Sequence, residues 1–302
     1  MHDLIVAGGA KDPSVARLIA RAEARGRQVL PLLHSDDDVP AFAWDYVANT
    51  ARVGRLPLKA KAAFIRHDVF SHAGQAPPRL DAAMAWYSAL AGWCLAERAM
   101  RMFNRRLDQR AGHKPCMLVL AREAGLAVPH GIAANERGAV VALGHPDGLI
   151  AKPVAGGGYC QALADVIDAI PWRDDRAPLP ALVQERLTYP EYRVYLIGER
   201  VLAFAIESAE IDYRREPGAA MRFLAPGGFD RDLGAQLHRL AAAVGVDFCA
   251  CDLKTDPASG TPVFLELNTQ PMFAAHDQVA EGAVADAILD HLDEGHSRTA
   301  VT

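Results

Sequence analysis

Residues 248–268 read FCACDLKTDPASGTPVFLELN, and no other part of the chain constrains the fold as strongly. Two apolar runs flank residues 256–260, whose composition is typical of a turn, so this stretch is predicted to form a β-hairpin. Glu266 and Asn268 lie two residues apart in the second strand, so their side chains leave the same face. Asp252 lies in the first strand, and the hairpin brings its carboxylate alongside. Such oxygens suit a hard cation such as Mg²⁺, although a strand with a polar outer face has the same pattern.

The cysteine content indicates a reducing compartment. Five cysteines in 302 residues form a sparse, odd-numbered set, which argues against a disulfide framework. Cys249 and Cys251 are too close together for a usual zinc site, and in a strand they share one face, so we expect small buried core residues. The N-terminus lacks the pattern of a signal peptide, and no run reaches the roughly 18 apolar residues of a membrane span. We therefore expect a cytoplasmic protein.

The composition is that of a globular protein with a sizeable core. The chain is 51% hydrophobic and 23% charged, and its length corresponds to about two average domains. It has 32 basic and 37 acidic residues, for a net charge of −5. Proteins that coat nucleic acid or anionic membranes are normally basic, so we expect neither as a partner.

The N-terminal part is predicted to be an α/β domain. Apolar runs at 4–7 and 29–33 flank a helical periodicity over 14–25, which is the strand–helix–strand order of a small parallel sheet. Gly8 and Gly9 follow the first run, but the third glycine of the dinucleotide-binding fingerprint is missing. The other elements expected in this half are a strand over 62–65 and helices over 80–102 and 112–125.

Two lysines and a glycine run precede the hairpin. Lys114 opens an apolar segment, and Lys152 ends the short strand 149–153, before the run 156–158. Consecutive glycines allow backbone N–H groups to approach phosphate, and Mg²⁺ commonly completes its shell with substrate phosphates. Two ammonium groups can neutralise phosphate charge from two sides. A glycine run alone is equally typical of a flexible hairpin, and the chain has no Walker A loop.

A candidate base site follows the glycine run. Leu182 and Val183 lead into Gln184 and Glu185, and Glu191 comes shortly after. An apolar strand of this kind can hold a purine by stacking and edge hydrogen bonds, and a carboxylate can accept hydrogen bonds from ribose hydroxyls. Taken alone, the Gln–Glu pair is a polar strand end. Neither a Ser-His-Asp nor a Cys-His set is evident, and no histidine pair has zinc-enzyme spacing.

In their order along the chain, these features resemble the ATP-grasp superfamily, chiefly over residues 100–292. The resemblance implies an α/β protein with the ATP-grasp fold and three parts. These are an N-terminal Rossmann-like pre-ATP-grasp domain (1–103), a central lobe with a glycine-rich flap (104–186) and a C-terminal lobe with a metal site (187–302). The implied cofactors are ATP and Mg²⁺, with two ions and with Mn²⁺ able to substitute.

The resemblance also implies roles for individual residues. It implies that the phosphates are contacted by Lys114, Lys152 and the flap glycines Gly156, Gly157 and Gly158. The adenine would be contacted by Gln184, Glu185 and Leu187, and the ribose by Glu191. The metal would be held by Asp252, Glu266 and Asn268 of the hairpin.

Within the superfamily, the RimK-like group of carboxylate–amine ligases is the most similar. The segments that carry this resemblance are Phe-Ile-Arg at 64–66, Phe-Asn-Arg at 103–105, Glu-Tyr-Arg at 191–193 and Asp-Tyr-Arg at 212–214. After Asn268 the chain reads TQPMF, which departs from the ending typical of the peptide-modifying members.

The implied reaction transfers the γ-phosphate of ATP to a carboxylate, and an amine or similar nucleophile then attacks the acylphosphate. Because two anions must meet, cationic side chains are required, and arginine suits both phosphate and carboxylate. The candidates are Arg193, Arg214, Arg222 and Lys254, with Arg66 and His67 as substrate residues.

The expected substrate is a small amino-acid-like or peptide carboxylate, and the expected assembly is a homo-oligomer. Two alternatives stay open. One is an intramolecular cyclase that closes a ring in a small antibiotic-like amino acid, and the other is a non-catalytic ATP-binding regulatory protein.

Overall fold

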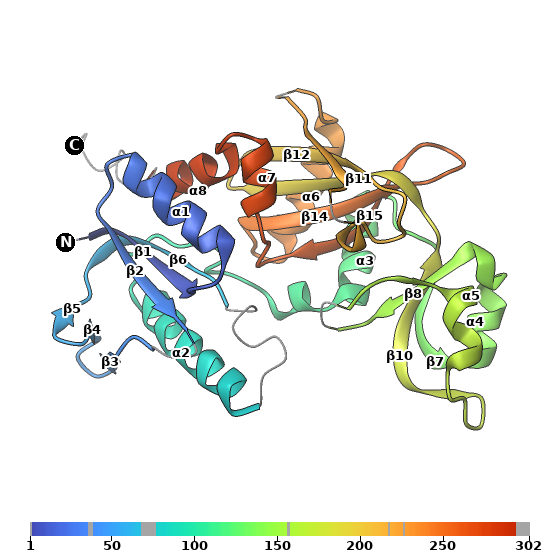
Figure 1. Cartoon of the computed structure of the whole chain (residues 1–302), viewed down its shortest axis with the longest axis horizontal. Coiled ribbons are helices and arrows are strands. Elements are labelled where there is room, and N and C mark those ends of the chain that lie inside the picture. The colour runs from blue at the N-terminus through green and yellow to red at the C-terminus, as the bar shows by residue number, and fades with distance from the viewer. Residues whose placement is uncertain are drawn as a thin grey trace. The chain divides into compact units, whose positions relative to one another are not determined.

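The computed structural model describes residues 2–35, 39–67, 77–155, 158–216, 218–225 and 227–293. The chain forms two compact units (Figure 1). The first contains Met1–Arg105 together with Gln270–Thr302, and the second is the continuous stretch Arg106–Thr269.

A three-stranded parallel sheet in the order β2–β1–β6 forms the centre of the first unit. Its strands are β1 (His2–Gly9), β2 (Val29–His34) and β6 (Ala60–Ile65). Helix α1 (Pro13–Ala24) connects β1 to β2 and begins at Asp12, whose carboxylate accepts hydrogen bonds from the first backbone N–H groups. The predicted strand–helix–strand order is confirmed.

One face of this sheet packs against α2 (Pro77–Ala96) and a small antiparallel sheet. That sheet consists of β3 (Phe42–Asp45), β4 (Thr50–Val53) and β5 (Leu56–Pro57). Helix α2 ends before the predicted residue 102. The chain beyond it returns to the sheet edge, where the backbone of Arg101 bonds to Lys61 and Ala63. This edge pairing replaces the last helical turns.

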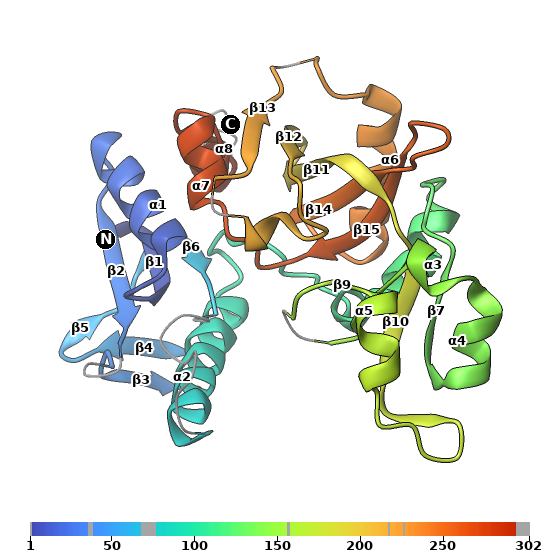
Figure 2. The ribbon, with the colours of Figure 1, turned by 45° about the vertical axis from the view of Figure 1, so that its right-hand side comes forward.

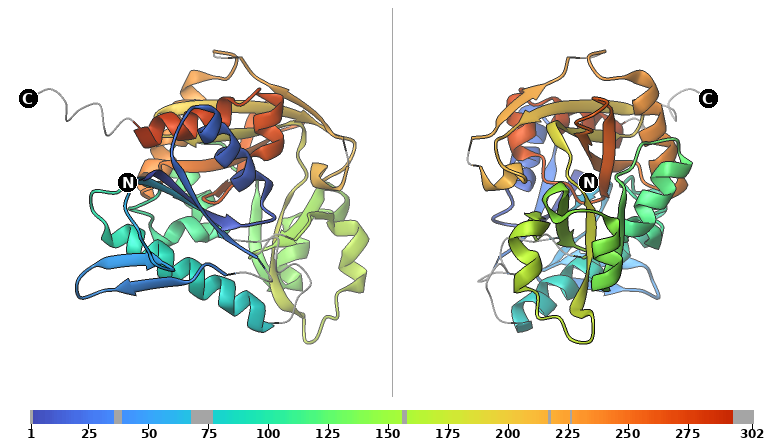
Figure 3. Two further views of the ribbon diagram at one scale, coloured as in Figure 1. Left: turned by 60° about the vertical axis from the view of Figure 1, so that its left-hand side comes forward. Right: turned by 90° about the vertical axis from the view of Figure 1, so that its right-hand side faces the viewer.

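The C-terminal helices α7 (Ala274–Val279) and α8 (Ala283–Asp293) belong to the first unit. They lie beside α1 (Figure 3). Three arginines at four-residue spacing, two in α1 and one directly after it, pair with aspartates of these helices. The pairs are Arg17 with Asp277, Arg21 with Asp286 at 2.8 Å, and Arg25 with Asp290 at 2.6 Å. The sequence places this segment in the C-terminal lobe, because helix pairing between distant segments leaves no local pattern.

In the second unit, a four-stranded sheet has the order β7–β10–β8–β9. Its strands are β7 (Gly131–Glu136), β8 (Leu149–Pro153), β9 (Gln161–Ala162) and β10 (Arg176–Glu185). One face is covered by α4 (Arg137–Leu143) and α5 (Leu163–Val166), with the short 3₁₀ helices η2 (Pro146–Gly148) and η3 (Ile167–Ala169) nearby.

The other sheet of this unit is antiparallel, in the order β13–β12–β11–β14–β15 (Figure 2). Its strands are β11 (Thr188–Ile197), β12 (Arg200–Glu207), β13 (Ala220–Phe223), β14 (Phe248–Thr255) and β15 (Pro262–Asn268). Helices α3 (Lys114–Glu123) and α6 (Arg231–Ala243) cover one face. Cys249 and Cys251 are fully buried in this core, as predicted. Two 3₁₀ turns, η1 (Gln109–Gly112) and η4 (Tyr213–Arg215), complete the unit.

A glycine fixes the approach of two segments near the end of α6. Gly245 has a φ of +66°, and a Cβ built there would lie 2.0 Å from the backbone oxygen of Arg106. Only glycine fits this conformation and this contact. Within the described ranges, none of the helices combines the length and hydropathy of a membrane-spanning segment.

Candidate active site

The predicted hairpin forms, and it places the three proposed metal ligands on one face. β14 and β15 pair with Asp252 opposite Glu266 and Ala250 opposite Asn268. Side chains alternate along a strand, so Asp252 points away from the cysteine side chains that pack against α3 and α6. The hydrophobic core therefore occupies one face of the hairpin, and its acidic residues occupy the other.

The two carboxylates of the hairpin have opposite electrostatic surroundings. Asp252 is 7% exposed, and both its oxygens accept from Nη1 of Arg193 at 2.7 Å. Burial raises the pKa of Asp252 against the attraction of Arg193, and the Glu266 carboxylate raises it further. Burial also acts to raise the pKa of Glu266, but the ammonium groups of Lys114 and Lys152 outweigh it and lower that pKa.

Both predicted phosphate lysines lie beside the hairpin. Nζ of Lys114, at the start of α3, is 3.2 Å from Oε2 of Glu266. Lys152 lies on β8, and its pKa is lowered by burial and by the positive charge of Lys114, while Glu266 opposes this. The structure thus brings two ammonium groups and one carboxylate together from α3, β8 and β15.

The predicted base-binding residues lie along β10. Lys152 pairs with Leu182 and Ile150 pairs with Gln184, so Gln184 and Lys152 share one face of the sheet. Gln184 is 3% exposed, and its Oε1 has no hydrogen-bond partner among the described residues. Because an unpaired buried acceptor is costly, this oxygen fits a ligand N–H group.

The other two residues that are predicted to contact the adenine, Glu185 and Leu187, are placed differently. The Glu185 side chain accepts a hydrogen bond from the backbone N–H of His130 at 2.9 Å, so it ties the start of β7 to β10. Leu187 is 8% exposed, as expected for a residue that offers apolar contact.

Glu191 and Lys254 form a buried pair beside Asp252. Their charged atoms are 3.5 Å apart, and each side chain is about one-tenth exposed. Burial raises the pKa of Glu191 to about 8, and the Asp252 carboxylate adds to this against Lys254. Lys254 also donates to the Ile211 carbonyl at 2.7 Å and lies 4.1 Å from the Tyr189 ring centre. The structure therefore groups Glu191 with the acidic hairpin, and its ribose role stays a prediction.

Arg214 reaches the glycine-rich segment, but Arg222 does not. Arg214 donates to the Gly158 carbonyl at 3.4 Å and lies 5.2 Å from the Tyr159 ring centre. Gly156 and Gly157 lie outside the described residues. Arg222 is exposed on β13 opposite Ala205, whose side chain packs on the α3 and α6 face. The alternation of strand side chains therefore turns Arg222 away from the face that carries Arg193.

The two predicted substrate residues lie in the first unit. Arg66 is 2% exposed, and it donates to the Asp12 carboxylate at 2.8 Å and to the Pro271 carbonyl. These bonds make it an internal tie between β6, the start of α1 and the C-terminal segment. The His67 ring lies edge-on to Tyr87 with ring centres 5.6 Å apart.

Three nearby residues are missing from the predicted set. Asp212 is buried against Arg214, and it caps the start of the turn η4, a position at which Asp is a preferred residue. Tyr189 supports Lys254. Cys160 is half-buried near Lys152, and burial raises the pKa of its thiol. Neither of the last two has a distinctive local pattern.

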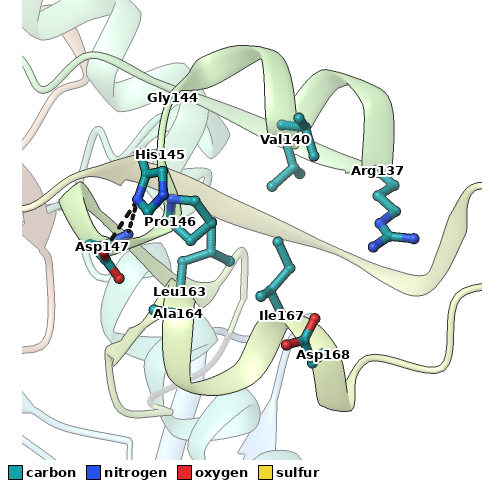
Figure 4. A pocket seen from close by; sticks show the side chains of 11 residues that line it. Arg137, Val140, Gly144, His145, Pro146, Asp147, Leu163, Ala164, Ile167 and Asp168 are labelled. Carbon is teal, nitrogen blue, oxygen red and sulfur yellow. Dashed lines mark hydrogen bonds and ion pairs between the residues drawn. The ribbon is translucent and has the colours of Figure 1, made fainter.

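A separate hollow of about 410 Å³ lies on the side of the β7–β10–β8–β9 sheet that carries α4 and α5 (Figure 4). His145 and Asp147 face each other at one end, with Nδ1 and Oδ2 3.3 Å apart, and Arg137 and Asp168 lie at the other. The hollow contains none of the predicted site residues.

The residues present fit the implied ligands. Two carboxylates and one carboxamide on a single face supply oxygen donors, and so few protein ligands leave coordination positions for water and phosphate oxygens. Among the described residues, no three His, Cys, Asp or Glu side chains are arranged so that they alone could hold a metal ion. The neighbouring lysines carry the positive charge that phosphates require, and Gln184 has an acceptor that a base can use.

Comparison with known proteins identifies the fold. No family model and no curated protein matches the chain. Among solved structures, the ATP-grasp ligase PsnB complexed with its minimal precursor is 26% identical, covers 96% of this chain and 100% of its own, and has a TM-score of 0.73. PsnB with a phosphomimetic precursor variant, Mg and ADP is 25% identical, with 96% and 99% coverage and a TM-score of 0.71. The macrocyclase MdnC from Microcystis aeruginosa MRC, bound with precursor peptide MdnA, is 18% identical, with 97% and 99% coverage and a TM-score of 0.71.

The chain belongs to the ATP-grasp superfamily. The predicted fold and the predicted enzyme class, an ADP-forming ligase, are confirmed. The assignment to the RimK-like group stays a prediction.

Proposed function

We propose that this chain is an ATP- and Mg²⁺-dependent ligase that activates a carboxylate of a peptide as an acylphosphate for attack by an amine or similar nucleophile. One observation carries the proposal: Lys114 pairs with Glu266 at 3.2 Å, and Lys152 lies near enough to act on the charge of Glu266, at the face that also presents Asp252. Support comes from the complexes of PsnB with its precursor and with Mg and ADP.

Each group of the site has a distinct part in binding. Asp252, Glu266 and Asn268 would hold Mg²⁺, which when bound neutralises phosphate charge and polarises the phosphoryl group. Lys114 and Lys152 hold the phosphates by charge. Because Lys152 is half-buried, its attraction for an anion is less screened than that of a surface lysine.

Gln184 supplies an acceptor for the base. Its Oε1 has no hydrogen-bond partner among the described residues and can accept a hydrogen bond from the exocyclic amino group of adenine.

The experiment is an ADP-release assay with a panel of peptides that carry Asp or Glu together with Ser, Thr or Lys. ADP should form only when ATP, Mg²⁺ and a suitable peptide are all present. We expect Lys152→Ala and Glu266→Ala each to lower turnover by about 100-fold or more, the size seen when one group that stabilises a developing charge is removed. The matched control is Lys61→Ala, because Lys61 is half-exposed and pairs with Asp3 in the other unit. Full turnover by both site variants would refute the assignment.

The mass of the product identifies the nucleophile. A peptide that becomes lighter by one water has closed a ring on itself, which is the cyclase alternative, whereas a heavier product has joined a second molecule. Binding of MgATP without ADP formation across the whole panel would instead favour the regulatory alternative. A cytoplasmic homo-oligomer without a nucleic-acid or membrane partner stays a prediction, and light scattering tests the assembly.

A further inference from the structure

Asp212 holds Arg214 in a fixed orientation. Its Oδ1 accepts from Nε of Arg214 at 2.8 Å and from the Arg214 backbone N–H at 3.2 Å, and its Oδ2 accepts from Nη2 at 2.5 Å. A two-point arginine–carboxylate contact of this kind fixes both position and plane of the guanidinium. These bonds occupy the Nε and Nη2 edge of the arginine and leave Nη1 for an anion.

The same contact between an aspartate and the arginine two residues later occurs at Asp108 and Arg110, and it allows the two motifs to be compared. Asp108 accepts from the Arg110 backbone N–H at 2.8 Å and from Nε and Nη2 at 3.0 and 3.1 Å, and both aspartates begin a 3₁₀ turn. The Asp108 side chain is 36% exposed, however, whereas that of Asp212 is 7% exposed. The local cap alone therefore explains the bonds within each motif but not the burial of Asp212.

Only the second motif engages the segment after the glycine-rich flap. Oδ2 of Asp212 also accepts from the backbone N–H of Cys160 at 3.3 Å. Arg214 donates to the carbonyl of Gly158 and lies over the ring of Tyr159. The buried carboxylate of Asp212 thus connects the turn η4 to the segment that follows Lys152.

This connection borders the proposed phosphate site. Glu266 lies near enough to Arg214 to raise the pKa of that arginine, although Asp212 is the main cause. Lys152 is likewise near enough to Cys160 for its positive charge to lower the pKa of the thiol, which opposes the rise that burial causes. The Arg214 side chain is 45% exposed, so a ligand can reach it.

We propose that Asp212 is a positioning residue for phosphoryl transfer. It orients Arg214 toward the transferred phosphoryl group and fixes that arginine to the segment Gly158–Cys160 beside Lys152. Asp212 itself does not touch the reacting atoms. The inference rests on the proposed function, because it assigns Arg214 a role in the same reaction.

The test compares turnover with nucleotide binding in Asp212→Asn. Asparagine retains one acceptor for the backbone N–H groups but loses the charge and the second oxygen that hold the guanidinium. We expect kcat for ADP formation with the best peptide of the panel to fall on the order of 10- to 100-fold, as for other lost supporting contacts. The Kd for MgAMPPNP, measured by calorimetry, should change less than about threefold, since the substitution leaves both phosphate-binding lysines in place. Asp108→Asn is the matched control and should leave both quantities unchanged.

A double-mutant cycle keeps the proposal falsifiable if the single variant is less stable. If Asp212 acts through Arg214, adding Asp212→Asn to an Arg214→Ala chain should cost less than about threefold in kcat, because coupled residues are not additive. Additive losses, or a wild-type kcat in Asp212→Asn, would overturn the inference alone. A wild-type chain that neither binds MgAMPPNP nor forms ADP would overturn the proposed function and this inference with it.

Discussion

Replacing Glu191 with glutamine should change how stability depends on pH. Glu191 is buried beside Asp252, and burial raises its pKa to about 8 from an ordinary 4.5. Between these two values the folded chain keeps a proton on Glu191 that the unfolded chain has released. Unfolding therefore releases a proton, and the contribution of Glu191 to stability is fully present below about pH 4.5 and is lost as the pH rises through about 8.

The size of the effect follows from the two pKa values. Each pKa unit corresponds to about 1.4 kcal/mol, so the difference between 4.5 and about 8 amounts to a loss on the order of 5 kcal/mol for the wild type. Glutamine has nearly the same shape and does not titrate. The free energy of unfolding of Glu191→Gln, relative to that of the wild type, should therefore rise across this pH range by several kcal/mol.

The assay is urea denaturation followed by circular dichroism, at a series of pH values from about 4.5 to about 8 and with a chelator to exclude divalent cations. The matched control is Glu207→Gln, because Glu207 is an exposed glutamate on the neighbouring strand β12 and should follow the wild type. Carboxyl ¹³C shifts would report the titration of Glu191 directly. Parallel stability curves for the wild type and Glu191→Gln would refute the reasoning, since they would mean that Glu191 ionises alike in both states.

Two further substitutions test the packing of the site and of its support. Arg193→Ala leaves Asp252 buried without its cation, and we expect a loss of about 3–5 kcal/mol in the free energy of unfolding, measured in urea; a loss under about 1 kcal/mol would mean that water replaces the guanidinium. Gly245→Ala adds a clash with a backbone carbonyl to a positive φ, and we expect it to cost about 2–5 kcal/mol. Gly26→Ala also has a positive φ, but it has open space around it, so it should cost only about 1 kcal/mol. Equal melting temperatures for the two glycine variants would contradict the role of the clash.

The hairpin illustrates what could be predicted from sequence. Period-two alternation and a turn of Asp, Pro, Ser and Gly determine which side chains share a face, and from that follow both the pairing of Asp252 with Glu266 and the burial of Cys249 and Cys251. These features are local, because they require only neighbours along the chain and one tight turn.

The features that the sequence did not reveal depend on contacts between distant segments. Arg222 is of a residue type that suits an anion site, but the register of β13 with β12 places its side chain on the face opposite to that of Arg193. Arg66 ends a strand as predicted, but Asp12 and Pro271 take up its hydrogen bonds. The pairing of Glu191 with Lys254 likewise depends on the alignment of β11 and β14, which no spacing in the sequence specifies.

The return of α7 and α8 to the first unit has a consequence for the order in which the protein can fold during synthesis. The ribosome delivers β1, α1 and β6 early, but Phe273, which packs against Phe64 of β6, and the aspartates that pair with α1 arrive only after the second unit. The second unit, in contrast, is complete once Asn268 has emerged, because all its strands lie within one continuous stretch. The unit that holds the candidate site can therefore finish folding first, whereas the N-terminal sheet is completed only when α7 and α8 have been synthesised.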